Sequence, residues 1–309
     1  MRCAVLASPD SWYLRDLRRA AGERHRVDCI AFDRISTTLD GVRHSLQATL
    51  DDAPERRPPK VDWNAYDAVL VRTMPPGSLE QVVFRMDALG RYEQQGGVVV
   101  NPPRAVEAAV DKYLTSARLQ AAGLETPRTW VGQHPDDALE AFHALGGDVV
   151  VKPLFGSEGR GIIRVADPDL AVRVFKTIAQ LNAVLYLQEF VDHLGHDIRL
   201  LVIGDETYGM RRHNPLDWRT NVSRGAVGEA FTPNDQLIEM ARRAAASVGA
   251  PVAGVDLLPT RDGRLLAIEV NAVPGWKALA QAVDVDIAAR VWRFVEAAVE
   301  RRSGVAHVG

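Results

Sequence analysis

The sequence is poor in cysteine and has no long apolar segment. Cys3 and Cys29 are the only cysteines among 309 residues, and their spacing matches neither a zinc site nor a dithiol motif. We expect both to be core thiols, because free cysteine is among the most buried residue types. Nowhere do 18 apolar residues follow one another, and the first apolar run is too short for a signal peptide. We therefore expect a cytoplasmic protein without a membrane partner.

Basic residues are not in excess either. The chain has 37 Lys and Arg residues against 40 Asp and Glu residues, which gives a formal net charge of -3. This balance gives no indication of nucleic acid as a constitutive partner. A hydrophobic content of 47% and a charged content of 25% are typical of a globular protein, and the length allows two or three domains.

Short β-branched runs alternate with helical patterns in the first third of the chain. The runs lie at 2–7, 27–32, 67–73 and 97–101, with helical patterns at 14–21 and 79–89. This alternation predicts a small α/β domain with a parallel sheet. Residues 51–60, rich in charge and proline, should form a surface loop. Arg72 follows the third run, at the edge where such sheets bind ligands, so it could hold a substrate carboxylate; a solvated or salt-bridged Arg72 fits as well.

The rest of the chain mixes both kinds of element. Helices are expected at 104–122, 135–145, 168–181, 233–248 and 286–301. Strands are expected at 127–131, 148–152, 185–191, 197–203 and 208–213, and a hairpin follows at 255–271. The strand at 148–152 ends on Lys152, directly before a glycine-rich segment.

This glycine-rich segment, residues 154–162, is a candidate phosphate-binding turn. Gly156, Ser157 and Gly159 belong to it, and missing Cβ atoms would let backbone N–H groups approach a phosphate. A plain hairpin turn explains the segment equally well, and it is neither a Walker A loop nor a dinucleotide fingerprint. In a nucleotide pocket, Lys112 and Lys152 would contact phosphates, and the backbone at 188–191 would meet the adenine edge.

The hairpin at 255–271 carries a candidate metal site. Glu269 and Asn271 stand two residues apart in an expected strand, so their side chains face the same side. Asp262-Gly263 suits a two-residue hairpin turn, which would place Asp256 directly opposite Glu269.

The same turn would set Arg261 opposite Arg264. Two carboxylates and an amide would then converge, and oxygen ligands suit Mg²⁺ or Mn²⁺ better than Zn²⁺. The alternative is a solvated Asp256 and a Glu269 paired with an arginine.

Arginines precede this hairpin in the sequence. Arg211, Arg219 and Arg224 lie within a short stretch. Phosphoryl transfer needs positive charge along the path of the transferred phosphate, and the cluster would supply it beside a metal site. By itself the cluster would be an ordinary surface patch.

Taken in order, these motifs resemble ATP-grasp ligases of the ribosomal-protein-S6 glutamate ligase, or RimK-like, type. The matching segments are Asp111-Lys112, Val151-Lys152-Pro153, 156–161, Gln188-Glu189-Phe190, Asp197-Ile198-Arg199, Arg219-Thr220-Asn221, Asp256 and Glu269-Val270-Asn271. The resemblance covers essentially all of residues 95–280. It implies an ATP-grasp fold of mixed α/β and α+β class, with an N-terminal pre-ATP-grasp domain at 1–102, a lid subdomain at 103–186 and a subdomain with the metal site at 187–309.

The resemblance also implies the chemistry. Such enzymes hold ATP between two α+β subdomains, phosphorylate a carboxylate to an acyl-phosphate and let an amine attack it, which releases ADP and phosphate. Two Mg²⁺ ions, or Mn²⁺ in their place, would bind Asp256, Glu269 and Asn271. Arg211 and Arg224 would be catalytic and steady the acyl-phosphate.

Further residues take their implied roles from the same resemblance. The residues implied to bind ATP are Lys112, Lys152, Gly156, Ser157, Gly159, Gln188, Glu189, Phe190, Val191, Asp197, Arg199, Arg219, Thr220 and Asn221. Arg72 and Arg212 are expected to contact the substrate.

Within this family, residues 71–81, 84–87 and 270–279 look most like tetrahydromethanopterin:α-L-glutamate ligases, which lengthen a C1-carrier cofactor. We therefore expect a small-molecule carboxylate and glutamate as substrates, and a homo-oligomer, either dimer or tetramer. The alternatives are an ATP-grasp kinase that phosphorylates a hydroxyl, a ligase that modifies a protein C-terminus, and a non-catalytic ATP-binding module.

Overall fold

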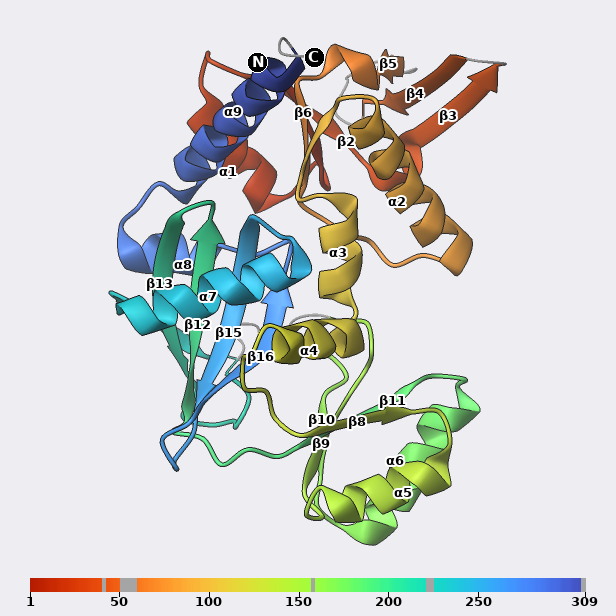
Figure 1. Cartoon of the computed structure of the whole chain (residues 1–309), viewed down its shortest axis with the longest axis vertical. Helices are drawn as coiled ribbons and strands as arrows, with labels where there is room; N and C mark the ends of the chain where they lie inside the picture. Colours follow the sequence, from red (N-terminus) through yellow and green to blue (C-terminus); the bar gives the residue numbers. More distant parts are fainter. Residues whose placement is uncertain (41–42, 51–59, 157–158, 221–224, 307–309) are drawn as a thin grey trace.

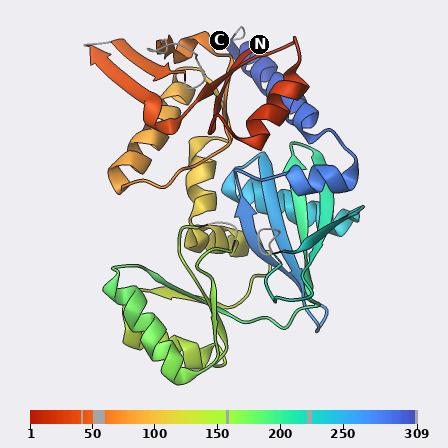
Figure 2. The same cartoon turned by 180° about the vertical axis from the view of Figure 1, so that it is seen from behind.

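The molecule is elongated and built in three tiers. The computed structural model describes residues 1–40, 43–50, 60–156, 159–220 and 225–306. An N-terminal domain forms one end, a small two-layer lid forms the other, and a five-stranded sheet lies between them (Figure 1). Seen from behind, the two chain ends again lie together at the N-terminal domain (Figure 2).

The N-terminal domain has the predicted parallel sheet. Its strands are β1 (Arg2–Leu6), β2 (Arg26–Ile30), β6 (Ala68–Val71) and β7 (Val98–Val100), in the order β2-β1-β6-β7. Helices α1 (Trp12–Ala21) and α2 (Leu79–Gln94) belong to the same domain. β6 is buried throughout, which agrees with its continuous apolar sequence, because helices cover both faces of a parallel sheet.

A three-stranded antiparallel sheet, absent from the sequence prediction, is inserted between β2 and β6. It consists of β3 (Ile35–Asp40), β4 (Arg43–Thr49) and β5 (Lys60–Asp62), flanked by the short helices η1 (Phe32–Arg34) and η2 (Trp63–Ala65). The alternating burial of Leu46, Ala48 and Leu50 shows the period of two that identifies a strand. Most of the surface loop predicted at 51–60 lies outside the described residues.

The single helix predicted at 104–122 is in fact two helices. α3 (Pro103–Val110) ends at Asp111, and α4 (Lys112–Ala121) begins immediately after it. Asp111 has extended backbone angles, and its side chain accepts the backbone N–H of Leu114, as an N-cap residue does. The break places Lys112 in the first turn of α4, at the edge of the lid.

The lid is a four-stranded antiparallel sheet covered by helices on one side. Its strands are β8 (Thr129–Gly132), β9 (Val149–Lys152), β10 (Ile163–Val165) and β11 (Leu185–Glu189), in the order β10-β9-β11-β8. Helices α5 (Pro135–Ala144) and α6 (Pro168–Gln180) cover its apolar face, where Phe142 and Phe175 are fully buried. The opposite face, with Lys152 and Gln188, lines the pocket described below.

The third part of the fold is the five-stranded sheet β14-β13-β12-β15-β16. Its strands are β12 (His196–Ile203), β13 (Glu206–His213), β14 (Val227–Phe231), β15 (Val252–Pro259) and β16 (Leu265–Asn271), with helices α7 (Asp235–Val248), α8 (Lys277–Val283) and α9 (Ile287–Ala306). α7 packs on one face of this sheet, and α9 runs back to pack beside α1 (Figure 1).

The apolar cores show which parts of the chain pack together. One core cluster joins residues of the N-terminal sheet with residues of β12, β15, β16 and α7, and a second cluster joins the N-terminal sheet with α9. The lid has a small core of its own. α3 and α4 pack on β16 and α7, and α4 also contacts the lid through Ser116. We therefore propose that the lid comprises β8 to β11, and that α9 belongs spatially to the N-terminal domain.

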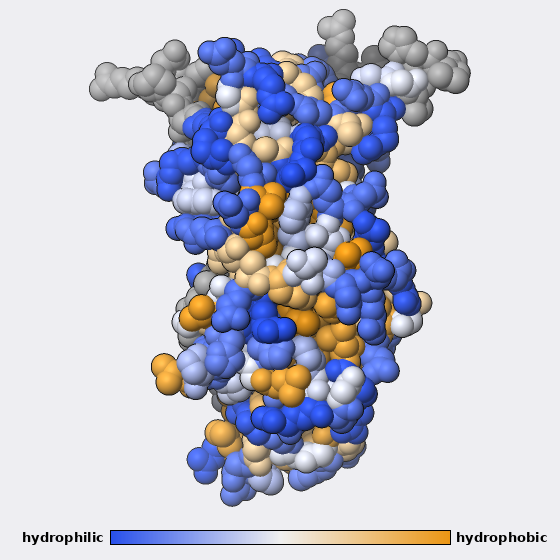
Figure 3. Space-filling view, turned by 90° about the vertical axis from the view of Figure 1, so that its left-hand side faces the viewer, coloured by the Kyte–Doolittle hydropathy of each residue, from blue (hydrophilic) through white to orange (hydrophobic). Residues whose placement is uncertain are grey.

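Among the residues that the structure describes, neither the helices nor the surface in Figure 3 has one long apolar region. Within the described ranges, no helix combines the length and apolar character that crossing a membrane requires. On the side shown in Figure 3, apolar side chains form separate patches in the middle and lower parts of the molecule, with hydrophilic side chains between them.

Asn101 joins the N-terminal domain to the five-stranded sheet. Its side-chain amide donates to the carbonyl oxygens of Val252 at 2.6 Å and Ala272 at 2.5 Å, and its oxygen accepts the N–H of Val252 at 3.0 Å. Asn101 is only 2% exposed, so no water replaces these bonds.

Asn101→Ala should therefore lower the free energy of unfolding by about 3 kcal/mol, because it leaves buried backbone groups without partners. Urea denaturation checks this value. Asn64→Ala, which truncates an exposed asparagine, is the control and should change stability by less than about 0.5 kcal/mol. Equal stability of the two variants would contradict the role given to Asn101.

Candidate active site

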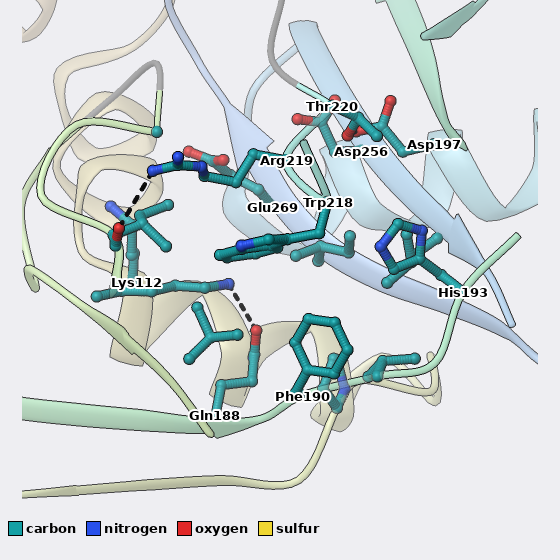
Figure 4. A pocket seen from close by; sticks show the side chains of 18 of the residues that line it. Lys112, Gln188, Phe190, His193, Asp197, Trp218, Arg219, Thr220, Asp256 and Glu269 are labelled. Atoms are coloured by element: carbon teal, nitrogen blue, oxygen red, sulfur yellow. Dashed lines mark hydrogen bonds between the residues drawn. The ribbon is translucent and has the colours of Figure 1, made fainter. Parts of the chain in front are cut away.

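A pocket opens between the polar face of the lid sheet and the five-stranded sheet (Figure 4). Most of the residues singled out from the sequence line it. These residues are Lys112, Lys152, Gly156, Gly159, Gln188, Glu189, Phe190, Val191, Asp197, Arg212, Arg219, Thr220, Asp256 and Glu269. Segments from all parts of residues 112–269 thus meet in one place, as a nucleotide site between two subdomains requires.

Lys152 projects from the end of β9 into this pocket. Its Nζ atom donates to Gln188 Oε1 at 2.6 Å. Burial lowers the pKa of Lys152 to about 8, while the negative charge of Glu269 acts in the opposite direction. Burial thus disfavours the charged form of Lys152, and a bound phosphate would stabilise that form.

Lys112 approaches the same pocket from the first turn of α4. Its Nζ atom donates to the carbonyl oxygen of Gly156 at 2.8 Å, so α4 touches the glycine-rich segment. Burial lowers the pKa of Lys112, and Glu269 again opposes this shift. Two lysines predicted to contact phosphates thus share one acidic neighbour.

The glycine-rich segment has the backbone geometry that requires glycine. Gly159 and Gly161 have φ angles of 69° and 72°, in the left-handed region that side chains disfavour. Gly156 and Gly159 line the pocket. Ser157, predicted to bind ATP from the same segment, lies outside the described residues.

The strand end at Glu189 and Phe190 forms one wall of the pocket. The carboxylate of Glu189 accepts the backbone N–H of Arg128 at 2.9 Å and its Nε at 2.6 Å, so this side chain is engaged away from any base. The guanidinium of Arg164 lies 3.4 Å from the centre of the Phe190 ring. The Glu189 side chain thus bonds within the lid, and the contact of backbone atoms at 188–191 with a base edge stays a prediction.

The hairpin of β15 and β16 brings Asp256 opposite Glu269, as predicted, although the turn differs. Thr260 N–H donates to Arg264 O at 2.9 Å, so the turn has three central residues rather than two. The expected pairing of Arg261 with Arg264 is therefore wrong. A bulge between Asp256 and Leu257 leaves Ile268 as the extra residue and restores the pairing.

Asp256 sits in a buried network of alternating charges. Arg199 Nη1 lies 2.6 Å from Asp256 Oδ1, and Arg212 Nη2 lies 2.9 Å from Asp256 Oδ2. Arg212 also donates to both carboxylate oxygens of Asp197, at 2.7 and 2.5 Å, and Thr220 donates to Asp197 Oδ2 at 2.6 Å. Burial alone would raise the pKa of Asp256, but the two arginines lower it.

The packing of Arg199 depends on a glycine. A Cβ atom at Gly254 would lie 2.7 Å from Cζ of Arg199, so the guanidinium can only cross β15 at a residue without a side chain. Arg199, predicted to bind ATP, does not line the pocket itself and instead holds Asp256.

Two of the three predicted metal ligands line the pocket. Asp256 and Glu269 do, whereas Asn271 does not, and Asn271 Oδ1 accepts the N–H of Val273 at 2.8 Å. Within the described ranges, His, Cys, Asp and Glu side chains form no group of three or more that could hold an ion. The pocket thus offers two carboxylates, Asp256 and Glu269, whose oxygen atoms suit a hard cation such as Mg²⁺. Each carboxylate oxygen that meets an arginine keeps a second lone pair.

The structure corrects the prediction for Arg211. Consecutive residues of a strand face opposite sides, and Arg212, not Arg211, points into the pocket. Arg211 is exposed on the other face, with its guanidinium 5.8 Å from the centre of the Phe231 ring. Arg212 is fully paired with Asp197 and Asp256, so it holds the site together rather than meeting a substrate directly. Arg224 and Asn221 lie outside the described residues.

Arg219 reaches the pocket from the loop before β14. Its Nη2 donates to Asp217 Oδ2 in the same loop at 2.6 Å. Its Nη1 lies 3.5 Å from the carbonyl oxygen of Ile162 in the lid. In Figure 4 the Trp218 ring lies between Gln188 and Phe190 on one side and Arg219 and Glu269 on the other. This loop thus spans the gap between the two subdomains.

Several pocket residues were missed by the sequence reasoning. They are Pro127, Val150, Arg160, Ile162, His193, Trp218, Leu258 and Ile268. Most are apolar. The sequence pattern does not distinguish an apolar residue that packs in a core from one that lines a pocket. Arg160 and Ile162 belong to the glycine-rich segment singled out at 154–162, and Trp218 is an aromatic in a loop beside two predicted site residues, so these three gave a signal that could have been used.

Arg72 lies at the predicted sheet edge but outside this pocket. Its guanidinium stacks on the rings of Trp276 at 4.1 Å and Tyr13 at 5.0 Å, and Nη2 donates to Pro274 O at 2.6 Å. Burial lowers the pKa of Arg72 to about 10. Arg72 thereby connects the N-terminal domain to the loop that follows Asn271.

Comparison with known proteins agrees with this geometry. The RimK-like ATP-grasp domain family matches residues 109–295. The chain is 33% identical over 267 residues to a tetrahydromethanopterin:α-L-glutamate ligase of Methanosarcina acetivorans, covering 82% of this chain and 81% of that protein. It is 33% identical over 213 residues to a ribosomal protein bS6–L-glutamate ligase of Escherichia coli, covering 68% of this chain and 71% of that protein.

Solved structures show the same fold. The ATP-grasp ligase PsnB, complexed with a minimal precursor, Mg and ADP, superposes with a TM-score of 0.70 at 23% identity, covering 96% of this chain and 97% of that chain. A RimK domain ATP-grasp protein from Sphaerobacter thermophilus superposes with a TM-score of 0.70 at 22% identity, covering 95% and 99%. The predicted ATP-grasp fold is therefore confirmed. The chain belongs to the RimK-like ATP-grasp family of ATP-dependent ligases.

Proposed function

We propose that this protein is an ATP-dependent carboxylate–amine ligase that adds L-glutamate to a small-molecule C1-carrier cofactor or its precursor. One observation carries the reaction class. Lys112 and Lys152 face Asp256 and Glu269 across a single pocket, which pairs phosphate-binding cations with candidate metal ligands. The relatives named as glutamate ligases support the choice of amine, and the tetrahydromethanopterin ligases support the acceptor.

The residues of the pocket fit the two halves of such a reaction. In the first half, an acceptor carboxylate oxygen attacks the γ-phosphorus of ATP and ADP leaves, so the lysines stabilise negative charge on the phosphates. In the second half, the glutamate nitrogen attacks the acyl carbon, loses a proton to solvent, and phosphate leaves. Arg199 and Arg212 keep Asp256 ionised and fixed throughout.

ATP-grasp ligases use ATP and a divalent metal ion. We propose that Asp256, Glu269 and Asn271 hold this metal here, with two Mg²⁺ ions and Mn²⁺ as a substitute. When bound, the metal would neutralise phosphate charge. Asn271 would have to share or release its bond to Val273 N–H.

The location of the acceptor follows from the loop after β16. Pro274 and Trp276 lie directly beyond the candidate metal ligands and contact Arg72. We propose that the acceptor enters between this loop and the N-terminal domain, where Arg72 is placed to meet a carboxylate. We further propose a cytoplasmic homo-oligomer, dimer or tetramer, without nucleic-acid or membrane partners.

Hydroxylamine trapping tests the reaction class. The protein is incubated with Mg²⁺, ATP, hydroxylamine and a candidate carboxylate, because only an acyl-phosphate yields a hydroxamate. Hydroxamate formation with ADP release supports the ligase. ADP release with a phosphorylated hydroxyl and no hydroxamate would establish the kinase alternative. Mass spectrometry of cofactor pools with and without the protein then identifies the acceptor.

The pKa of Lys152 gives a pH dependence to nucleotide binding. Burial lowers this pKa to about 8, so Lys152 loses its proton as the pH rises above 8, and the deprotonated amine no longer attracts a phosphate. The dissociation constant for ADP should therefore increase by up to about tenfold per pH unit above 8, with proton uptake on binding. Calorimetry in buffers of different ionisation enthalpy measures both effects. Lys152→Arg should remove this pH dependence, because arginine stays charged.

A further inference from the structure

A chain of buried polar groups leads from the body of the protein to Lys152. Ser116 on α4 and the hydroxyl of Tyr186 on β11 are 2.9 Å apart. The Tyr186 hydroxyl lies 3.4 Å from Gln188 Nε2, and Gln188 Oε1 accepts from Lys152 Nζ at 2.6 Å. Ser116, Tyr186 and Gln188 are 8%, 1% and 3% exposed. No water competes for these contacts, so the series of hydrogen bonds holds the Lys152 ammonium group in place.

The partners of Gln188 determine how its amide is oriented. Thr129 donates its hydroxyl proton to Pro127 O at 2.9 Å, so its oxygen accepts from Gln188 Nε2 at 3.0 Å. The Tyr186 hydroxyl accepts from the same Nε2 atom. With its two N–H groups directed to hydroxyl oxygens, Gln188 must turn its carbonyl oxygen toward Lys152.

The acceptor of the Lys152 proton is uncharged. Among the described residues, Gln188 Oε1 is the only hydrogen-bond acceptor that Lys152 Nζ contacts. The charges of Glu269, Lys112 and Asp256 influence the pKa of Lys152. In the described part of the chain, Lys152 forms no ion pair with Glu269 or Asp256. The amide thus fixes the position of the ammonium group without adding a negative charge beside it.

We propose that Gln188 is a positioning residue that holds Lys152 through a neutral acceptor, so that the full charge of the lysine is left for a nucleotide phosphate. This inference rests on the proposed function, because it assumes that Lys152 binds a phosphate. It gives the Gln188 side chain a role separate from the backbone of the same strand, which would meet the base.

Two substitutions separate charge from geometry. Gln188→Glu keeps the size of the side chain and adds a competing negative charge beside Lys152. Gln188→Met keeps the approximate size and removes the acceptor. Gln180→Glu, at the exposed end of α6 in the same lid, adds the same charge away from the pocket and is the matched control. Thermal melting confirms that each variant is folded.

Binding of ADP with Mg²⁺ and of adenosine is then measured by calorimetry. For Gln188→Glu we expect the ADP affinity to fall about tenfold, since an opposite charge within hydrogen-bond distance compensates the lysine, and adenosine affinity to stay within about twofold. Gln188→Met should lose less ADP affinity than Gln188→Glu. Gln180→Glu should bind both ligands like the unchanged protein.

Three results would overturn the inference. They are unchanged or tighter ADP binding by Gln188→Glu, an equal loss of adenosine and ADP affinity, and a greater loss in Gln188→Met than in Gln188→Glu. If the unchanged protein binds no ADP at all, the proposed function fails, and the role of Gln188 fails with it. Normal ADP binding by the unchanged protein and by Gln188→Glu would reject the positioning role alone.

Discussion

Glu269→Ala should abolish ATP-dependent ligation, with a loss of at least about 1000-fold in turnover. Glu269 lines the pocket, stands opposite Asp256 in the hairpin, and its charge counteracts the burial of both lysines. Its removal would take away a candidate metal ligand and leave Lys112 and Lys152 deprotonated over a wider pH range. Release of ADP in the presence of Mg²⁺ and a carboxylate measures the loss.

The fold should survive this substitution. Glu269 is half-buried and faces another carboxylate, so its removal relieves a repulsion, and we expect the free energy of unfolding to change by less than about 1 kcal/mol. Glu229→Ala, which removes an exposed carboxylate from β14 of the same sheet, should keep full turnover. Retained turnover in Glu269→Ala with Mg²⁺ present would contradict the metal assignment.

Arg212→Met should give the largest loss of stability. Arg212 is 6% exposed and pairs with both Asp197 and Asp256, so its removal leaves the buried Asp197 without an arginine partner and Asp256 with Arg199 alone. Loss of one partner from such a buried network costs about 3–5 kcal/mol. Urea denaturation at pH 8 measures this cost directly.

The loss should shrink as the pH falls. Without Arg212, burial and repulsion from Asp256 raise the pKa of the Asp197 carboxyl group above its unfolded value, whereas Arg199 still pairs with Asp256, so the folded variant binds more protons than the unfolded chain. The stability of the variant relative to the unchanged protein therefore increases as the pH falls from 8 toward 5. Arg211→Met, an exposed neighbour on the same strand, should show neither effect. A pH-independent loss in Arg212→Met would rule out buried charge as the cause.

The sequence predicted the elements of the fold well where local patterns suffice. The buried strands β1, β6 and β9 are apolar and β-branched, and most of the motifs from Lys112 to Glu269 line one pocket. The pairing of Asp256 with Glu269 was predicted correctly, although the prediction assumed a two-residue turn and no bulge. A longer turn shifts the register by one residue, and the bulge at Ile268 shifts it back, so two unrecognised irregularities compensate.

Other features depend on contacts that no local pattern encodes. Whether Arg211 or Arg212 enters the pocket depends on the strand phase, which the neighbouring strands set through their register. The division of the predicted helix at Asp111 required recognition of an aspartate as a cap within a continuous helical pattern. The role proposed for Gln188 depends on hydroxyl groups of Thr129, Tyr186 and Ser116, which only the folded lid and α4 bring together.

The small core of the lid is closed on itself, with Phe142 and Phe175 packed among residues of β9, β10 and β11 and not among those of the other two tiers. Changes in the N-terminal domain, where we propose that an acceptor docks, need not disturb the packing of the lid. A lineage could therefore alter the loops around Arg72, where we propose that the acceptor docks, while it inherits the lid unchanged. Cofactor-directed and protein-directed glutamate ligases are both 33% identical to this chain, as an inherited lid would allow.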